Sequence, residues 1–200
     1  MKKLVYLISP NKIRKSFYRD LDKVLSFNNV KYFQLRLKNI GKNKLLNIIN
    51  KVKKITKKNK VIFILNDDYL LAAKVRADGC HMGQLDGSFK IARKKLKNKI
   101  LGITCHNSKK LVKNAVRLKA DYIALGSFFK SKLKPRAKTA NFNILKWSKK
   151  NIKKPIVVIG GINNFNYKRL LSAGAKYIAI SSFIWDNPNL KPELAIKMFK

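Results

Sequence analysis

Three stretches of the chain repeat one pattern: ADGCHMG at residues 77–83, ADYIALG at residues 120–126 and AKYIAIS at residues 175–181. Each stretch follows a segment with helical spacing, continues through a short apolar run and stops at Gly or Ser. A small residue at the end of a strand lets a ligand approach the backbone closely. The repeat therefore predicts strands of one regularly built sheet, with ends that a ligand can reach.

Five further apolar runs resemble the runs inside these three stretches. They are short, rich in β-branched residues and almost free of charge, as parallel strands are when both faces of the sheet are covered. The sequence predicts eight strands in all, which we place at residues 4–8, 30–35, 61–65, 79–82, 100–104, 122–125, 156–159 and 177–180.

Segments with helical spacing lie between the strands. One apolar stripe, with lysines on the other face, is formed by Leu45, Ile48, Ile49, Val52 and Ile55. A second stripe follows the cap-like pair Asn107-Ser108. Further helices are predicted after Asn163-Asn164 and, as the last helix, after Pro188 and Pro192.

Eight alternating strands and helices with a repeat in the even-numbered strands favour a closed (β/α)8 barrel, the TIM-barrel fold, in one α/β domain over residues 1–200. An open flavodoxin-like or Rossmann sheet is the alternative. No G-x-G-x-x-G motif follows the first strand, which argues against the Rossmann form.

Length and composition agree with one globular domain. The chain has 200 residues, of which 46% are hydrophobic, but 47 Lys and Arg residues stand against 9 Asp and Glu residues, giving a net charge of +38. Such a charge suits a protein that binds polyanions. The basic residues are mostly lysines spread along every helical segment, so we expect a solvated outer face and no nucleic-acid partner.

The sequence also predicts a cytoplasmic protein that does not enter membranes. The apolar run at residues 4–8 is shorter than a signal-peptide core, and no apolar stretch has the length of a membrane span. Cys80 and Cys105 are consistent with reduced thiols in that compartment.

Polar residues follow the apolar runs, where the active site of such a barrel lies. Arg36, Lys38 and Lys134 are cations that would face the same mouth as the carboxylates of Asp67 and Asp86. Mg²⁺ prefers hard oxygen ligands and uses few protein carboxylates, so the combination suits a Mg²⁺ ion bridged to a diphosphate. Surface ion pairing is the alternative interpretation.

A second anion site is predicted after the seventh and eighth runs. Gly160-Gly161 and Ser181-Ser182 occupy the loops that often bind phosphate through backbone N–H groups in these barrels. Taken alone, the glycine pair is equally consistent with a simple turn.

Two Cys-His dipeptides, Cys80-His81 and Cys105-His106, raise the possibility of zinc. Successive strand residues point to opposite faces, so each dipeptide would send one ligand to a shared centre, which disfavours the metal. Packing in the core is the expected role of Cys80. His106, near the mouth, is a candidate for proton transfer.

The ordered motifs give the chain a resemblance to the thiamine-phosphate synthase family, within the superfamily that also contains the thiazole tautomerases. The motifs extend over nearly the whole chain: QLRLK at residues 34–38, NDD at 66–68, HMGQLD at 81–86, LG at 125–126 and IGGI at 159–162. The resemblance implies a transferase of thiamine biosynthesis. It would join a hydroxymethylpyrimidine diphosphate to a thiazole phosphate, with Mg²⁺-assisted, dissociative loss of pyrophosphate.

The resemblance also implies roles for individual residues. Arg36, Lys38, Thr104 and Lys134 would be catalytic and Asp67 and Asp86 would bind Mg²⁺. The pyrimidine diphosphate would be held by Gln34, Leu35, Arg36, Leu37, Lys38, Asn66, Thr104 and Lys134. The thiazole phosphate would be held by Ser131, Lys132, Leu133, Gly161, Ser181 and Ser182.

Some positions depart from the family pattern. Leu37 stands where the family usually has Glu, Thr104 where it has Ser, and Leu133 in a loop where a hydroxyl side chain is usual. Leu133 cannot donate the hydrogen bond of that hydroxyl, which leaves the thiazole acceptor open. A thiazole tautomerase, a sugar-phosphate epimerase and a noncatalytic polyanion-binding protein are the alternatives, and the oligomeric state is left open.

Overall fold

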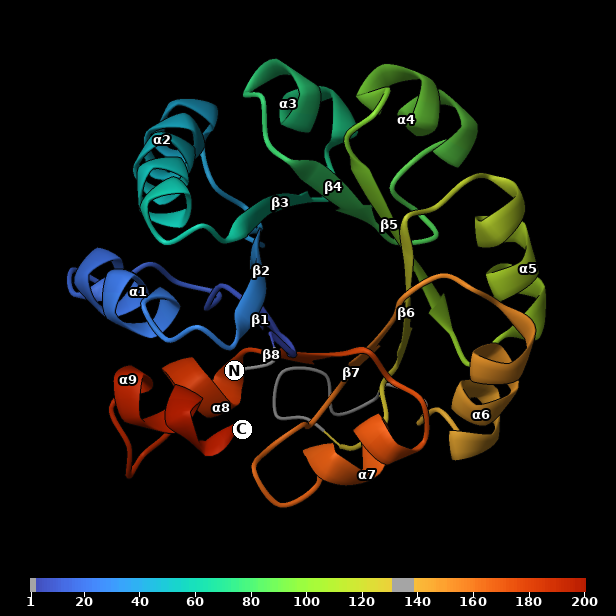
Figure 1. Cartoon of the computed structure of the whole chain (residues 1–200). Coiled ribbons are helices and arrows are strands. Elements are labelled where there is room, and N and C mark those ends of the chain that lie inside the picture. The colour runs from blue at the N-terminus through green and yellow to red at the C-terminus, as the bar shows by residue number, and fades with distance from the viewer. Residues whose placement is uncertain (1–2, 131–138) are drawn as a thin grey trace.

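The structure, a computed structural model, describes residues 3–130 and 139–200 as a closed barrel of parallel strands inside a ring of helices (Figure 1). The strands are β1 (Val5–Ile8), β2 (Val30–Leu35), β3 (Ile62–Asn66), β4 (Gly79–Met82), β5 (Ile100–His106), β6 (Tyr122–Gly126), β7 (Ile156–Ile159) and β8 (Tyr177–Ile180). The (β/α)8 prediction is confirmed, and the open-sheet alternative is wrong, because β8 pairs with β1.

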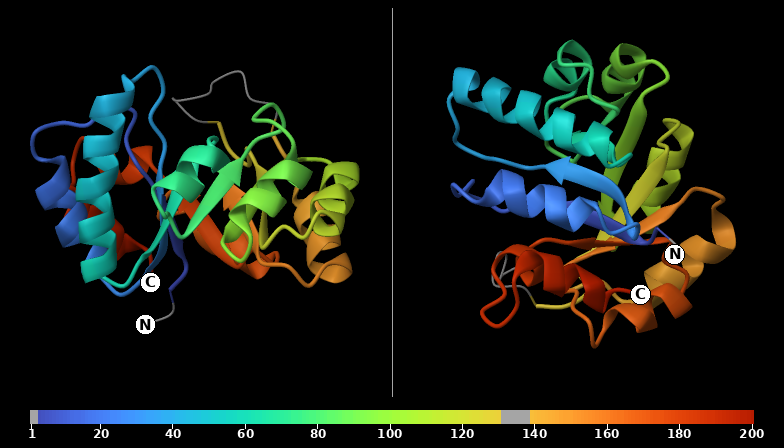
Figure 2. Two further views of the ribbon diagram at one scale, coloured as in Figure 1. Left: turned by 90° about the horizontal axis from the view of Figure 1, so that it is seen from above. Right: turned by 60° about the vertical axis from the view of Figure 1, so that its left-hand side comes forward.

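A helix follows each strand in the described part of the chain. The helices are α1 (Phe17–Leu25), α2 (Lys42–Lys58), α3 (Tyr69–Lys74), α4 (Phe89–Leu96), α5 (Lys109–Arg117), α6 (Phe142–Asn151), α7 (Tyr167–Ser172), α8 (Ser182–Trp185) and α9 (Pro192–Ala195), followed by a short 3₁₀ turn (Ile196–Met198). The views in Figure 2 show the helices on the outside of the strands. Within the ranges that are described, no helix is long and apolar enough to cross a bilayer. The cytoplasmic location stays a prediction.

The alternation of strand residues divides the core into two layers. In β1, Val5 and Leu7 pack outward under the helices, while Tyr6 and Ile8 join a second cluster inside the barrel. Both layers consist largely of buried side chains, and burial of each large aliphatic or Phe side chain contributes roughly 1.5–3 kcal/mol. The barrel interior is therefore a packed core, and substrates can be received only at its ends.

Strand β5 extends further than the sequence indicates. The predicted strand ends at Thr104, but β5 continues to His106, and its register against β6 shifts between Thr104 and His106. A shift of this kind inserts an extra residue and turns the strand. Thr104 is consequently a strand residue at the rim, and His106 has a left-handed backbone with φ 50°.

At the end of the barrel where the strands begin, Arg93 of α4 forms hydrogen bonds and an ion pair with the segments before β5 and β6. Its guanidinium donates to Asp121 Oδ2 at 2.8 Å and to the carbonyls of Lys97 and Lys99. Asp121 Oδ2 also accepts from the Leu101 N–H at 2.8 Å. One largely buried cation thus connects α4 with the beginnings of β5 and β6.

We predict that Arg93→Ala lowers the free energy of unfolding by about 2 kcal/mol, because it leaves partly buried acceptors unpaired. Urea unfolding followed by circular dichroism measures the change. Lys95→Ala, which removes an exposed cation from the same helix, is the matched control. Equal effects of the two substitutions would contradict the role of Arg93.

Candidate active site

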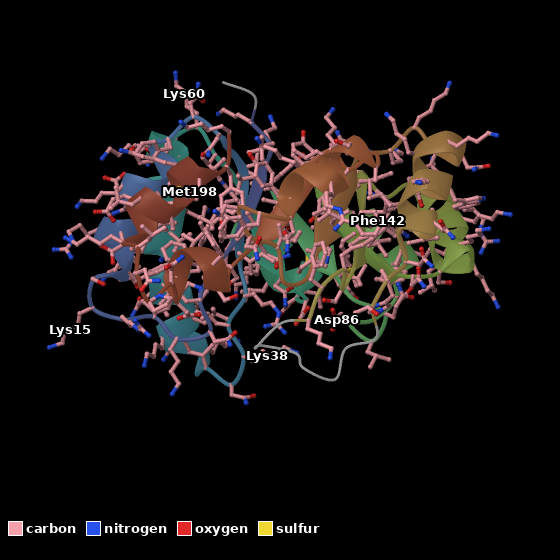
Figure 3. The ribbon with its side chains drawn as sticks, turned by 90° about the horizontal axis from the view of Figure 1, so that it is seen from below. Lys15, Lys38, Lys60, Asp86, Phe142 and Met198 are labelled. Atoms are coloured by element: carbon pink, nitrogen blue, oxygen red, sulfur yellow. The ribbon has the colours of Figure 1, made fainter. Side chains whose placement is uncertain are left out.

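The carboxyl ends of the strands bring the predicted acids and cations to one mouth. Figure 3 shows Lys38, after β2, and Asp86, after β4, at the same end of the molecule, with Lys60 at the other end. Asp67 follows β3 directly. Residues that are separated by up to about fifty positions in the sequence are therefore neighbours in space because parallel strands end at a common rim.

Asp67 and Asp86 form a carboxylate pair. Burial of Asp67 and its hydrogen bond and charge repulsion with Asp86 raise the pKa of Asp67 to about 6, and the charges of Lys38 and Arg36 act in the opposite direction. These effects require all four side chains to share one site. Arg36, Lys38 and Asp86 thus lie near Asp67, whereas Lys134, expected at the same mouth, lies outside the described residues.

Backbone contacts hold the two acids in position. The Asp67 N–H donates to the His81 carbonyl at 2.8 Å, and Asp67 has a left-handed backbone with φ 68°. The Gly83 N–H donates to Asp86 Oδ2 at 2.6 Å. An unfavourable backbone conformation at a non-glycine residue is a feature that clusters at functional sites.

The carboxylate pair suits a hard divalent cation. Two adjacent carboxylates repel each other, and Asp67 and Asp86 could hold a Mg²⁺ ion, whose charge would offset that repulsion and which uses few protein carboxylates. Across residues 3–130 and 139–200, no cluster of three or more His, Cys, Asp or Glu side chains forms a complete protein cage for a metal. Asp68 is not part of the pair, because its side chain caps α3 by accepting from the Leu71 N–H at 2.8 Å.

The QLRLK segment divides its side chains between two faces. Gln34 is buried inside the barrel, whereas Leu35 and Leu37 pack in the outer layer under the helices. Leu35 and Leu37 can therefore contribute to a binding site only through their backbone. Ser9 fixes the segment: the Arg36 N–H donates to Ser9 Oγ at 2.9 Å, and that hydroxyl donates to the Arg36 carbonyl at 3.2 Å.

Asn66 and Thr104 lie at the same rim, around His81. Asn66 ends β3 and is in register with His81 of β4. Thr104 Oγ1 is 2.8 Å from His81 Nε2, and the Gln84 side chain donates to the Thr104 carbonyl. The sequence analysis did not assign His81 and Gln84 to the site. Strand alternation could have identified His81, because it places the His81 side chain on the interior face of β4, opposite to Cys80.

The predicted phosphate loops close the other side of the mouth. Gly160 and Gly161 follow β7 with φ values of 106° and 61°, and a side chain on either glycine would overlap Ser127 or Lys130. Ser181 and Ser182 follow β8, and Ser181 Oγ donates to the Ser9 carbonyl at 3.1 Å. The remaining predicted contacts, Ser131, Lys132, Leu133 and Lys134, lie outside the described residues.

The two Cys-His dipeptides do not meet in a zinc site. Cys80 and Cys105 are buried in the outer layer, His81 lies on the interior face and His106 is exposed. Burial raises the pKa of Cys105 to about 12, so its thiol stays protonated. The cysteines are core residues, as the sequence indicated for Cys80.

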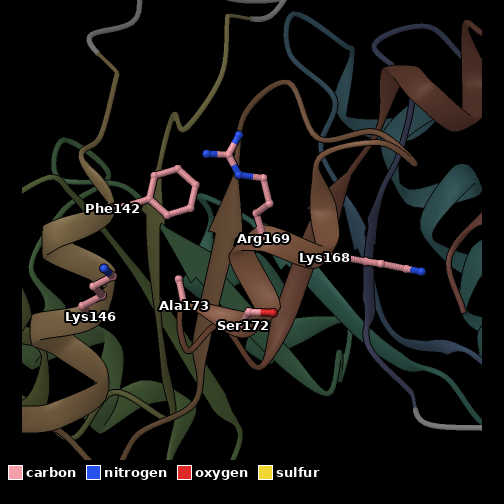
Figure 4. Close-up of a pocket in the computed structure, with 6 residues that line it drawn as sticks. All are labelled: Phe142, Lys146, Lys168, Arg169, Ser172 and Ala173. Carbon is pink, nitrogen blue, oxygen red and sulfur yellow. The ribbon is translucent and has the colours of Figure 1, made fainter.

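A separate hollow lies on the outer ring between α6 and α7 (Figure 4). Phe142, Lys146, Lys168 and Arg169 line it, and the Arg169 guanidinium lies 5.6 Å from the centre of the Phe142 ring. A cation over an aromatic face accounts for this contact. None of the predicted site residues that the structure describes lines this hollow.

The fold and the rim define a (β/α)8 barrel protein whose mouth carries a carboxylate pair with Arg36 and Lys38 nearby. Comparisons with known proteins narrow this class. The model of the family described as thiamine monophosphate synthase matches residues 5–184. The chain therefore belongs to the thiamine monophosphate synthase family.

Individual relatives agree with this assignment. A thiamine-phosphate synthase of Pelagibacter ubique is 52% identical over the whole of this chain and 97% of its own length. That of Erythrobacter litoralis is 37% identical over 90% of this chain and 87% of its own. Among solved structures, a thiamine phosphate pyrophosphorylase from Pyrococcus furiosus superposes with a TM-score of 0.87, covering 98% of this chain and 93% of that one, at 24% identity. The last likeness supports the fold.

His81 gives the stability a pH dependence. Burial lowers the pKa of His81 from 6.5 to about 4, so below pH 6.5 the unfolded chain binds a proton that the folded chain does not. We predict that the contribution of His81 to the free energy of unfolding falls as pH drops from 6.5 towards 4, by up to about 1.4 kcal/mol per pH unit, whereas Asp67, with its raised pKa, contributes in the opposite direction.

Urea titrations at several pH values test this dependence by comparing variants, which cancels the contribution of the carboxyl groups. The difference in slope between wild type and His81→Gln should equal the His81 contribution, and His106→Gln, which changes the exposed histidine, should show the wild-type slope. An unchanged slope in His81→Gln would show that His81 is equally protonated in both states.

Proposed function

We propose that this protein is a thiamine-phosphate synthase. It would join 4-amino-2-methyl-5-hydroxymethylpyrimidine diphosphate to a thiazole phosphate and release thiamine phosphate and pyrophosphate. The observation that carries the proposal is the gathering of Arg36 and Lys38 around the Asp67–Asp86 pair at the barrel mouth, in a chain of this family.

The reaction breaks one bond and forms another at the pyrimidine methylene carbon. The C–O bond to the diphosphate breaks first and its electron pair leaves with pyrophosphate. The thiazole nitrogen then donates its lone pair to the resulting pyrimidine cation. Charge therefore builds up on the departing oxygens, where preorganised cations lower the barrier most.

Residues of the mouth divide this work between them. Arg36 and Lys38 would stabilise the leaving diphosphate, and Gln34, Asn66 and Thr104 would orient the pyrimidine diphosphate. Asp67 and Asp86 would hold Mg²⁺, which neutralises phosphate charge when it is bound. Lys134 is proposed as a further cation on the resemblance alone.

The thiazole phosphate is assigned to the opposite side of the mouth. Gly161, Ser181 and Ser182 follow β7 and β8, and the positive φ of Gly161 allows close backbone approach. The same role for Ser131, Lys132 and Leu133 rests on the resemblance. We further propose that the partners of the protein are these two small phosphorylated substrates.

Two other activities predict different behaviour. A thiazole tautomerase would move a proton in the thiazole ring without releasing pyrophosphate. A polyanion-binding protein would bind nucleic acid in a salt-dependent manner that is undiminished when Asp67 and Asp86 are changed. The carboxylate pair and its flanking cations favour the synthase, because neither alternative requires them.

The test of function is incubation of the purified protein with both substrates and Mg²⁺, followed by mass analysis of the products. We expect thiamine phosphate and pyrophosphate in equal amounts, and neither product when one substrate is omitted. A rearranged thiazole without pyrophosphate would identify a tautomerase and overturn the proposal.

Removing one charged group of the mouth should nearly abolish turnover. We predict that Asp86→Ala and Arg36→Ala each lower kcat by about a hundred- to a thousandfold, the usual cost of losing a preorganised electrostatic group. The control variants Asp22→Ala on α1 and Arg117→Ala on α5 remove the same charges from the outer ring and should keep wild-type rates. Near-normal activity of a folded Asp86→Ala or Arg36→Ala protein would defeat the assignment.

Removal of divalent cations gives a separate prediction. Chelation with EDTA should stop pyrophosphate release, and added Mg²⁺ should restore it. Asp67→Asn should raise the Mg²⁺ concentration that gives half-maximal rate, because one carboxylate ligand is lost. Full activity in the presence of excess chelator would exclude a metal held by this pair.

A further inference from the structure

A continuous chain of hydrogen bonds crosses the interior of the barrel from β2 to β5. Gln34 Nε2 donates to the Tyr6 hydroxyl at 3.1 Å, and the Tyr6 and Tyr122 hydroxyls are 2.7 Å apart. The Tyr122 hydroxyl is 3.0 Å from His81 Nδ1, and His81 Nε2 is 2.8 Å from Thr104 Oγ1. The two ends of the chain, Gln34 and Thr104, are residues that the preceding section assigns to the pyrimidine diphosphate.

The chain is built into the core of the barrel. Tyr6 and Tyr122 are 2% and 1% exposed, and their rings pack edge to face at 5.7 Å between centroids. The His81 ring stacks on Tyr122 with an interplanar angle of 8°. Gly102 makes room for this packing, because a side chain at Gly102 would overlap the Tyr122 ring. The five linked side chains therefore have little freedom to rotate.

The donor and acceptor of each hydrogen bond can be assigned from the hydrogens that each group carries. Burial raises the pKa values of Tyr6 and Tyr122, so both hydroxyls keep their hydrogens, and an imidazole with one accepting nitrogen has a single N–H. Gln34 donates to Tyr6, so Tyr6 can donate to Tyr122 and Tyr122 to His81 Nδ1. The imidazole hydrogen must then be on Nε2, where it is donated to Thr104 Oγ1. Each acceptor in this arrangement receives one hydrogen.

We propose that His81 is a positioning residue, which donates from Nε2 to the Thr104 hydroxyl and thereby leaves the hydrogen of that hydroxyl available for the substrate. His81 acts through Thr104 and does not itself touch the reacting atoms. Thr104 would then donate to a diphosphate oxygen, an interaction that strengthens as negative charge builds up there. The identity of that substrate rests on the proposed function, but the direction of the hydrogen bonds does not.

The reverse direction makes the opposite prediction. If the Gln34 amide were turned, its oxygen would accept from Tyr6, and every donor along the chain would reverse. His81 would then carry its hydrogen on Nδ1 and accept from Thr104, which would have no hydrogen left for a diphosphate. The tautomer of His81 therefore decides between a Thr104 that donates to substrate and one that cannot.

The first test is the ¹⁵N NMR spectrum of histidine-labelled protein without substrates at pH 7.5. The chain contains only two histidines, so His106→Gln identifies the His81 signals. We expect the neutral Nε2–H tautomer, with Nδ1 unprotonated. The Nδ1–H tautomer would overturn the proposal whether or not the protein has synthase activity.

The second test is a double-mutant cycle on His81 and Thr104, measured as pyrophosphate release. His81→Leu and Thr104→Val should each lower kcat/KM for the pyrimidine diphosphate by about ten- to a hundredfold, the value of one hydrogen bond to a charged group. In the Thr104→Val background, His81→Leu should cost less than about threefold further, because its effect passes through Thr104. The KM for the thiazole phosphate should stay unchanged, whereas a general loosening of the barrel would alter it.

Two tyrosine variants provide the matched comparison. Tyr122→Phe removes the hydroxyl that bonds His81 Nδ1 and should lower kcat/KM in the same direction as His81→Leu. Tyr177→Phe removes a hydroxyl from the same interior cluster but outside the chain of hydrogen bonds, and should leave kcat/KM unchanged. This pair also tests the proposal if His81→Leu does not fold.

The outcomes separate this inference from the proposed function. Multiplicative costs in the double-mutant cycle, or equal effects of Tyr122→Phe and Tyr177→Phe, would overturn the positioning role while the synthase assignment stands. Failure of the wild-type protein to make thiamine phosphate would overturn the synthase assignment, and the NMR result would still decide the direction of the hydrogen bonds.

Discussion

Closure of the parallel sheet is the constraint on which the rest of the structure depends. Once β8 pairs with β1, all eight carboxyl ends lie on one rim, and residues from the full length of the chain become neighbours. The same closure leaves an interior that only inward-facing side chains can fill. The mouth and the chain of hydrogen bonds beneath it are therefore two consequences of one topology, and a change in strand register would disturb both.

Acidic residues are scarce in this chain, so the close approach of Asp67 and Asp86 points to a specific role for the pair. Within the described chain, several of the other acids make structural contacts: Asp78 accepts from the Phe63 N–H, Asp121 pairs with Arg93, and Asp68 caps α3. Asp67 and Asp86 instead approach each other, which raises the pKa of Asp67 and disfavours its charged form. An arrangement that is unfavourable for the isolated protein is expected where a bound cation completes it.

The sequence predicted the fold more completely than the site. All eight strands lie within two residues of the predicted ranges, because buried parallel strands leave unbroken apolar runs that periodicity detects. The gathering of Arg36, Lys38, Asp67 and Asp86 followed from strand ends alone. The interior hydrogen bonds did not, because the tyrosines of β1 and β6 look like ordinary core residues in sequence. Their pairing depends on strand neighbours across the barrel and on the space that Gly102 leaves for the Tyr122 ring, which a single sequence does not reveal.

The interior hydrogen bonds and the charged side chains of the mouth differ in the range and the direction of their interactions. Long cationic side chains such as Arg36 and Lys38 follow a moving charge through flexible stems, and their attraction acts over several ångströms. A hydroxyl or an amide is effective only at hydrogen-bond distance and in one orientation. The hydrogen bonds of Gln34 to Tyr6 and of Thr104 to His81 fix both side chains in the barrel. If these residues bind the pyrimidine diphosphate as proposed, little conformational entropy is lost on binding. In the proposed enzyme, the barrel core would thus fix the direction of the hydrogen bonds to the substrate, while the rim would provide charge.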